Sequence, residues 1–143
     1  MNNPAPSPDP SRWRDLKSPT IEDFEALARE EFDRLPDTFR ALCGDLVIRV
    51  EDFATDEVLF KMGIEDPLDL LGLFEGIGLP FQSVQQSGTM PNMIWLYRMP
   101  IIDYWASHDE TLGALVSHVL IHEIGHHFGL SDADMEAIEA SAE

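Results

Sequence analysis

The sequence has little cysteine, and it has no long apolar run. Its single cysteine, Cys43, excludes a disulfide within the chain, which suits a reducing compartment, and we expect this residue to fill the core. The sequence has no run of about 18 apolar residues, so it predicts no membrane span. The residues from Met1 to Pro4 lack the charged and apolar regions of a secretory signal. We therefore expect a soluble, cytoplasmic protein.

Basic residues are also scarce. Nine Lys and Arg stand against 27 Asp and Glu, which gives a formal net charge of -18. Such a charge repels the phosphates of nucleic acids and of anionic membranes, so neither is an expected partner. Arg98 is the last basic residue, and all five histidines follow it. This acidic final third should favour cations and, as a hypothesis, basic peptide substrates; the alternative is that the charge serves only solubility.

The length and composition predict one domain preceded by an arm. The chain has 143 residues, of which 44% are hydrophobic, and this suffices for a single core. Residues 1–18 contain four prolines and no apolar periodicity, which predicts an extended, disordered arm. We place a single domain at residues 19–143.

Helix and strand signals alternate along that domain. A capping box at Thr20 and Asp23 begins an amphipathic helix that ends before Pro36. Apolar or β-branched runs predict strands at 46–50, 70–75 and 92–99. Shorter signals predict a helical turn at 37–42, a short helix within 52–63, turns at 76–80 and 83–90, a helix or loop at 101–106, a long helix capped by Ser107 or Asp109, and a final helix at 132–140. This order predicts an α+β domain with a small mixed β-sheet packed on a buried helix.

The long helix carries the sequence His122-Glu123-Ile124-Gly125-His126. On a helix of 3.6 residues per turn, His122 and His126 lie one above the other, where both can bind one metal ion. Glu123 lies beside them and can address a metal-bound water. Because a buried apolar helix does not tolerate such side chains pointing inward, we expect them to be paired or bound to metal. Gly125 costs about 1 kcal/mol relative to Ala, so we also expect close packing there.

A catalytic zinc needs a third protein ligand. Gly129 can adopt the positive φ that ends a helix and turns the chain, so that Asp132 could reach the metal. The alternative for Asp132 is a place in the first turn of the last helix, with Asp134 and Glu136 as replacement ligands. We expect His118 and His127 to support the site or fill the core. Together these residues predict a zinc site at the end of the long helix.

The segment from His122 to Asp132 has the pattern HExxHxxGxxD and resembles the small bacterial zincin-like metallopeptidases. The resemblance extends through 70–76 and 94–101, which look like the family's two apolar strand motifs, and covers about residues 47–138. It implies a minimal zincin-like metalloprotease domain in which His122, His126 and Asp132 bind Zn²⁺ and Glu123 is the catalytic glutamate. Met135 follows Asp132 too closely to serve as the methionine turn of the metzincins.

The implied function is zinc-dependent hydrolysis of peptide bonds in a peptide or protein, with Glu123 as the general base. Tyr97, Tyr104 and His127 are the candidates for a second donor to the oxyanion. We expect the substrate to add to the strand at 70–75, and the arm is a candidate cover for the cleft.

Other functions remain open at this point. One is a catalytically weak or inactive, zinc-stabilised domain that binds a basic protein. Another is a peptide deformylase, although Cys43 lies in a different sequence order from the cysteine ligand of those enzymes. Iron or manganese would also suit two histidines and a carboxylate. Neither the oligomeric state nor the substrate follows from these patterns.

Overall fold

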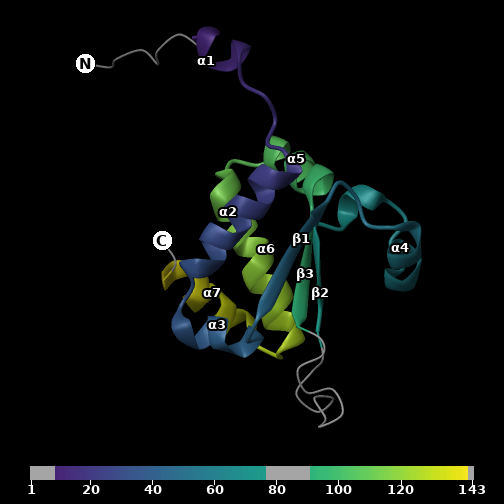
Figure 1. Ribbon diagram of the computed structural model, residues 1–143, viewed down its shortest axis with the longest axis vertical. Coiled ribbons are helices and arrows are strands. Elements are labelled where there is room, and N and C mark those ends of the chain that lie inside the picture. The colour runs from purple at the N-terminus through teal and green to yellow at the C-terminus, as the bar shows by residue number, and fades with distance from the viewer. Residues whose placement is uncertain (1–8, 77–90, 142–143) are drawn as a thin grey trace.

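Three strands form the mixed sheet at the centre of the fold (Figure 1). The computed structural model describes residues 9–76 and 91–141. The strands are β1 (Leu46–Glu51), β2 (Gly72–Glu75) and β3 (Asn92–Tyr97), in the order β1-β3-β2. β3 pairs in parallel with β1 and in antiparallel with β2. The predicted α+β fold with a small mixed sheet is therefore confirmed.

One face of the sheet packs against α2 (Ile21–Asp33) and α6 (Leu112–His127), as Figure 1 shows. Strand residues alternate between the two faces, so every second residue of β1 and β3 enters this core. These buried residues are Leu46, Ile48, Val50, Ile94 and Leu96. The opposite face carries a smaller cluster under α4 (Asp56–Met62), made by Ala54, Leu59, Leu70 and Tyr97. The sheet thus separates a large core, which includes α6, from a small one.

Helix caps account for where α2 and α6 begin. Thr20 and Asp23 form the predicted capping box, in which each side chain accepts a hydrogen bond from the other's backbone N–H. The cap of α6 was predicted at Ser107 or Asp109, which is wrong: Thr111 Oγ1 accepts the hydrogen bond from Ala114 N. Ser107 instead ends the preceding helix. The long helix therefore starts later than the two predicted caps implied, at Leu112.

The junction of β3 and α5 (Arg98–Ser107) differs from the prediction. The apolar run predicted a strand to residue 99, but the strand ends at Tyr97 and the helix begins at Arg98. Pro100 is tolerated because the first N–H groups of a helix need no intrahelical partner. Of the two alternatives for residues 101–106, the helix is confirmed.

The shorter predicted elements are largely present. The turn at 37–42 is α3 (Asp37–Cys43), and α4 is the short helix expected within 52–63. The strand predicted at 70–75 begins only at Gly72, because Leu70 ends a 3-10 turn, η1 (Pro67–Asp69). The turn at 83–90 and the bend after Gly76 lie outside the described residues.

The two ends of the described chain differ in burial. Residues 9–18 are all exposed and include the one-turn helix α1 (Ser11–Arg14), which stands apart from the domain in Figure 1. The final helix, α7 (Asp132–Ser141), packs on α6 through Met135, which is fully buried. Within the described residues no helix has the length and apolar character of a membrane span. The division into an arm at 1–18 and a domain at 19–143 stays a prediction.

Candidate metal centre

The histidines of α6 form a row along one side of the helix. His118, His122 and His126 are spaced four residues apart, which places them on successive turns of one face. The rings of His118 and His122 have centroids 4.0 Å apart, and those of His122 and His126 are 5.9 Å apart. The predicted juxtaposition of His122 and His126 is thus present.

This row lies on the open side of α6. The apolar residues of the helix are buried on the other side, among them Val116, Leu120 and Ile124. His118 and His126 are exposed and His122 is half-buried. The expectation that these histidines point inward is therefore wrong, because the apolar residues fill the sheet side of the helix and leave the histidines at the surface. Their positions are accessible to a cation and to a substrate.

Glu123 has a more enclosed environment than the histidines beside it. It is half-buried, and burial raises the pKa of Glu123, while the neighbouring His126 and His122 offset part of this effect. A carboxylate with a raised pKa is better able to hold a proton near neutral pH. The helix therefore presents a carboxylate beside two imidazoles, a type of side chain that can bind metal.

The end of α6 has the turn predicted at Gly129. Gly129 has φ +75°, a left-handed conformation that favours glycine. Its N–H donates to the carbonyl of His126 at 3.2 Å, and Leu130 N–H donates to that of Gly125 at 2.9 Å. These two bonds make a Schellman motif, which satisfies carbonyls at the helix end and reverses the chain into α7.

The turn leads to Ser131 and Asp134, which cap α7. Ser131 Oγ accepts from Asp134 N at 3.1 Å, and the Asp134 carboxylate accepts from Ser131 N at 3.2 Å. Asp132 is the first residue of the helix and is exposed. The structure does not bring its carboxylate together with His122 and His126 as a compact ligand group. The role of Asp132 as a ligand stays a prediction.

A carboxylate that the sequence analysis missed contacts the histidine row. Glu139 Oε1, from the last part of α7, lies 2.6 Å from His122 Nε2 and 2.9 Å from His118 Nδ1. Among the described residues, His118, His122 and Glu139 are the group whose potential ligand atoms all lie within 4.8 Å of one another. In the sequence, only spacing could have indicated Glu139 as a partner of the histidines. It lies two turns beyond Asp132 on the same helix and therefore on the same helix face.

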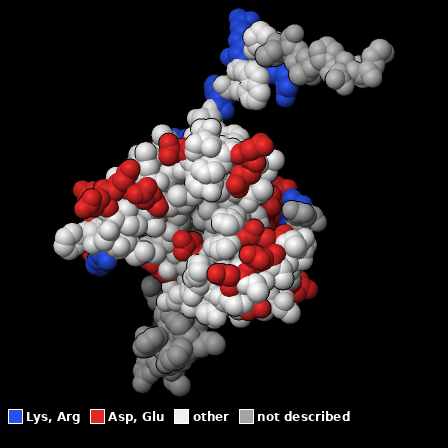
Figure 2. Space-filling model, turned by 180° about the vertical axis from the view of Figure 1, so that it is seen from behind, with Lys and Arg blue, Asp and Glu red and all other residues white. Residues whose placement is uncertain are grey.

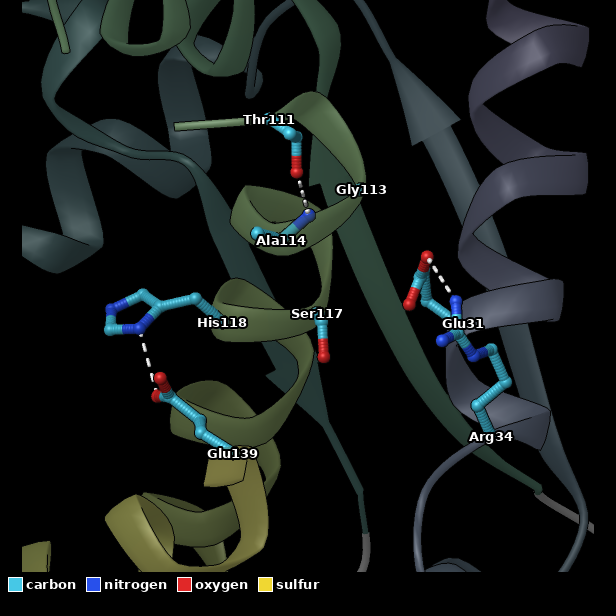
Figure 3. Close-up of a pocket in the computed structure, with 8 residues that line it drawn as sticks. All are labelled: Glu31, Arg34, Thr111, Gly113, Ala114, Ser117, His118 and Glu139. Atoms are coloured by element: carbon cyan, nitrogen blue, oxygen red, sulfur yellow. Dashed lines mark hydrogen bonds and ion pairs between the residues drawn. The ribbon is translucent and has the colours of Figure 1, made fainter. Parts of the chain in front are cut away.

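Figure 3 shows His118 and Glu139 pointing toward each other across the α6–α7 contact. They border a pocket of about 260 Å³ that is also lined by Glu31 and Arg34 of α2. Ser117, the neighbour of His118, lies on the side of α6 nearer to α2 in the same view, whereas His118 points away from α2. The pocket is therefore continuous with the histidine row and adds both acidic and basic groups at its border.

The two tyrosines that are candidates for a second hydrogen-bond donor to the oxyanion lie in different surroundings. Tyr97 is buried, and burial raises the pKa of Tyr97 to about 12, with further contributions from the charges of Glu75, Glu51 and Glu123. Tyr104 stacks on His108, with ring centroids 3.7 Å apart. The charge of Glu123 thus has a minor effect on the pKa of Tyr97, whose side chain lies in the cluster on the face of the sheet away from α6.

β2, at the edge of the described sheet, lies against α6. A Cβ atom on Gly72 would come 2.8 Å from Val119 Cγ1, so β2 and α6 approach more closely than a side chain would allow. Further along, the rings of Phe74 and His127 have centroids 4.5 Å apart. His127 therefore packs on β2, which supports its predicted place outside the ligand set.

A family model described as a zincin-like metallopeptidase matches residues 43–142. The chain belongs to this family. The match includes the sheet, α6 and α7, whereas α2 lies outside it. A comparison with curated proteins finds no match.

Cys43 decides whether the alternative of a peptide deformylase, whose metal site includes a cysteine, has structural support. Cys43 is buried in the large core, where burial raises the pKa of its thiol to about 11. It is not in the group of potential ligands around His122. A deformylase-type site that includes Cys43 is therefore not supported.

Proposed function

We propose that this member of the zincin-like family is a zinc-dependent metallopeptidase in which Glu123 is the general base. Support comes above all from Glu123 itself, which is half-buried with a raised pKa beside two histidines on one face of α6. Its position combines a proton acceptor with imidazoles that suit zinc.

In this proposal His122 and His126 hold the zinc ion, and Asp132 supplies the carboxylate that the family pattern implies. The donor set fits zinc, because imidazole and carboxylate are among its usual ligands. The exposure of His126 and the turn at Gly129, which returns the chain along α6, support this arrangement. Zinc held there would act as a Lewis acid toward the substrate carbonyl and the attacking water.

In the proposed reaction, Glu123 would transfer the proton. The Glu123 carboxylate accepts a proton as water adds its oxygen to the carbonyl carbon, and it donates that proton to the departing amine nitrogen when the C–N bond breaks. Its half-buried position beside His122 and His126 supports both roles.

We further propose that the peptide substrate adds to β2. Among the described strands it is at the edge of the sheet, next to β3, and it packs against α6, the helix that carries Glu123. An extended peptide can extend such an edge through backbone hydrogen bonds.

The charge distribution supports a preference for basic peptides. On the face shown in Figure 2, acidic side chains are spread over the domain and basic ones are few. A pocket of about 220 Å³ on the other side of the sheet from α6 joins the carboxylates of Glu51 and Glu75 to the rings of Trp95, Tyr97 and Phe53. A Lys or Arg side chain would find both carboxylates and aromatic faces there.

The decisive experiment pairs zinc analysis with a peptide-library digest of Glu123→Gln. We expect this variant to keep stoichiometric zinc and to lose hydrolysis by about 10²–10⁴-fold, the range of general-base catalysis. Glu110→Gln is the matched control, because Glu110 is exposed before α6, and it should keep both properties. Full turnover in Glu123→Gln would rule out the assigned base. Stoichiometric zinc without any cleavage by the wild-type chain would favour a zinc-stabilised binding domain instead.

Substrate preference needs a separate measurement. Cleavage of basic peptides should exceed that of matched acidic peptides, and the difference should shrink as salt is raised, because exposed charges are screened. Glu75→Gln should narrow the difference while Glu110→Gln leaves it unchanged. Equal rates for both peptide classes at low salt would refute the preference.

A further inference from the structure

A second arrangement of potential ligands shares His122 with the proposed zinc site. It consists of His118 and His122, one turn apart on α6, and Glu139 from α7. The two histidines contact the same carboxylate oxygen, at 2.9 Å and 2.6 Å. Two separate helices thus supply three donor atoms that converge from different directions.

The chemistry of these donors suits a divalent cation. Two imidazoles and a carboxylate match the ligand types of zinc, and also of manganese and iron. Around a tetrahedral zinc with bonds of about 2 Å, ligand atoms lie roughly 3.3 Å apart. Small outward movements of the three side chains would therefore admit the ion. Their exposed fractions of 49%, 27% and 34% leave room for such movements.

We propose that His118, His122 and Glu139 form a second site for a divalent cation, which competes for His122 with the site at His122 and His126. His122 Nε2 makes the contact with Glu139 and has one lone pair, so it can serve one cation at a time. The existence of this site depends only on the three side chains. Its competition with the other site rests on the proposed function.

Competition at His122 has a consequence for activity. Each of the two states holds one zinc ion and needs His122, so the relative affinities of the two sites, and not the zinc concentration, set the fraction of chains in each state. Chains with zinc at His118 and Glu139 would lack the catalytic zinc, although neither residue belongs to the proposed catalytic ligands. Removing either residue should therefore raise the rate of hydrolysis per bound zinc.

Zinc titration of the full-length chain tests the site directly, with isothermal calorimetry and a chromogenic chelator as competitor. His126→Ala removes the proposed catalytic pair and should still bind about one equivalent of zinc. Adding Glu139→Gln to that variant should reduce the affinity by about tenfold or more, through loss of a ligand. Adding Glu110→Gln, an exposed position before α6, should leave the affinity unchanged.

Two results would overturn the proposal. The first is a folded His126→Ala variant, verified by circular dichroism, that binds no zinc. The second is an equal affinity with and without Glu139→Gln. Two tight equivalents on the wild-type chain would refute the competition alone. These readouts do not depend on hydrolysis, so a failure of the peptidase proposal would be distinguished from a failure of this one.

Discussion

Gly125 of α6 lies directly against the side chain of Met135 of α7. A Cβ atom on Gly125 would come 2.5 Å from Met135 Sδ and 2.9 Å from its Cγ. Gly125 stands between Glu123 and His126, so the contact that fixes α7 on α6 lies within the proposed zinc-binding segment. The close packing predicted at this glycine is confirmed, and its partner is a helix.

Gly125→Ala should destabilise the fold, although alanine is the better helix former. Helix propensity would stabilise by about 1 kcal/mol, while overpacking a buried contact costs about 1–3 kcal/mol. Urea unfolding should therefore show a net loss. In a Met135→Ala background the same substitution should become neutral or stabilising, because the obstructing side chain is gone. A stabilising effect in the presence of Met135 would contradict this packing.

Arg98 links the start of α5 to two distant segments. Its Nε donates to Asp52 Oδ1 at 2.7 Å, and another guanidinium nitrogen donates to the carbonyl of Pro19 at 2.8 Å. Arg98→Ala should lower the free energy of unfolding by about 1.5–3 kcal/mol, the range for hydrogen bonds to charged groups. Arg98→Lys should recover only part of this, because an ammonium lacks the planar fork. Arg49→Ala, at an exposed position on β1, is the control and should change little.

The side chain of Asn92 donates a hydrogen bond to a backbone carbonyl just before β1. Its Nδ2 donates to the Cys43 carbonyl at 2.7 Å, and the side chain is buried. Asn92→Ala should cost about 1–3 kcal/mol in urea unfolding, because the carbonyl is left without its donor. Asn92→Asp should cost more, since a carboxylate oxygen would face the carbonyl oxygen. An unchanged midpoint for both variants would show that the bond contributes nothing.

The raised pKa of Cys43 predicts how the free energy of unfolding changes at alkaline pH. Its pKa is raised from 9.0 to about 11 by burial, so the folded state favours the neutral thiol. The resulting contribution to stability is fully present below about pH 9 and is lost as the pH rises through about 11. The difference in unfolding free energy between the wild type and Cys43→Ala should shrink over that interval. A difference that stays constant would contradict the shift.

Thiol labelling gives an independent measurement of the same residue. At about pH 8 the folded chain should react slowly with a thiol reagent, and denaturant should release the full reactivity, because burial suppresses both access and the thiolate. Rapid labelling of the folded chain would show that Cys43 is accessible.

Local patterns predicted most of the elements because short-range chemistry decides them. The Thr20 capping box, the strand at Leu46 and the turn at Gly129 each depend on side chains and backbone preferences within a few residues. The predicted ends of elements were wrong where the same residues suit both a strand and a helix. The apolar run beyond Tyr97 suits a strand or a buried helix equally well, and Pro100 is compatible with a strand end or a helix start.

The histidine spacing was sufficient to predict that His122 and His126 share a face and that Glu123 stands beside them. Periodicity fixes that relation on any helix. The same periodicity could not tell whether the face is buried, because apolar residues occur nearly all around α6. Only packing against α2 and the sheet decided that the histidines face outward.

The sequence by itself determined the motif, the helix that carries it, the turn that follows and the family to which these belong. The tertiary structure alone decided which carboxylate contacts His122. Asp132 and Glu139 are on one helix, and the angle at which α7 returns along α6 sets which of them approaches the histidines. At this crossing Met135 packs against Gly125, and no local preference brings these residues of two helices together.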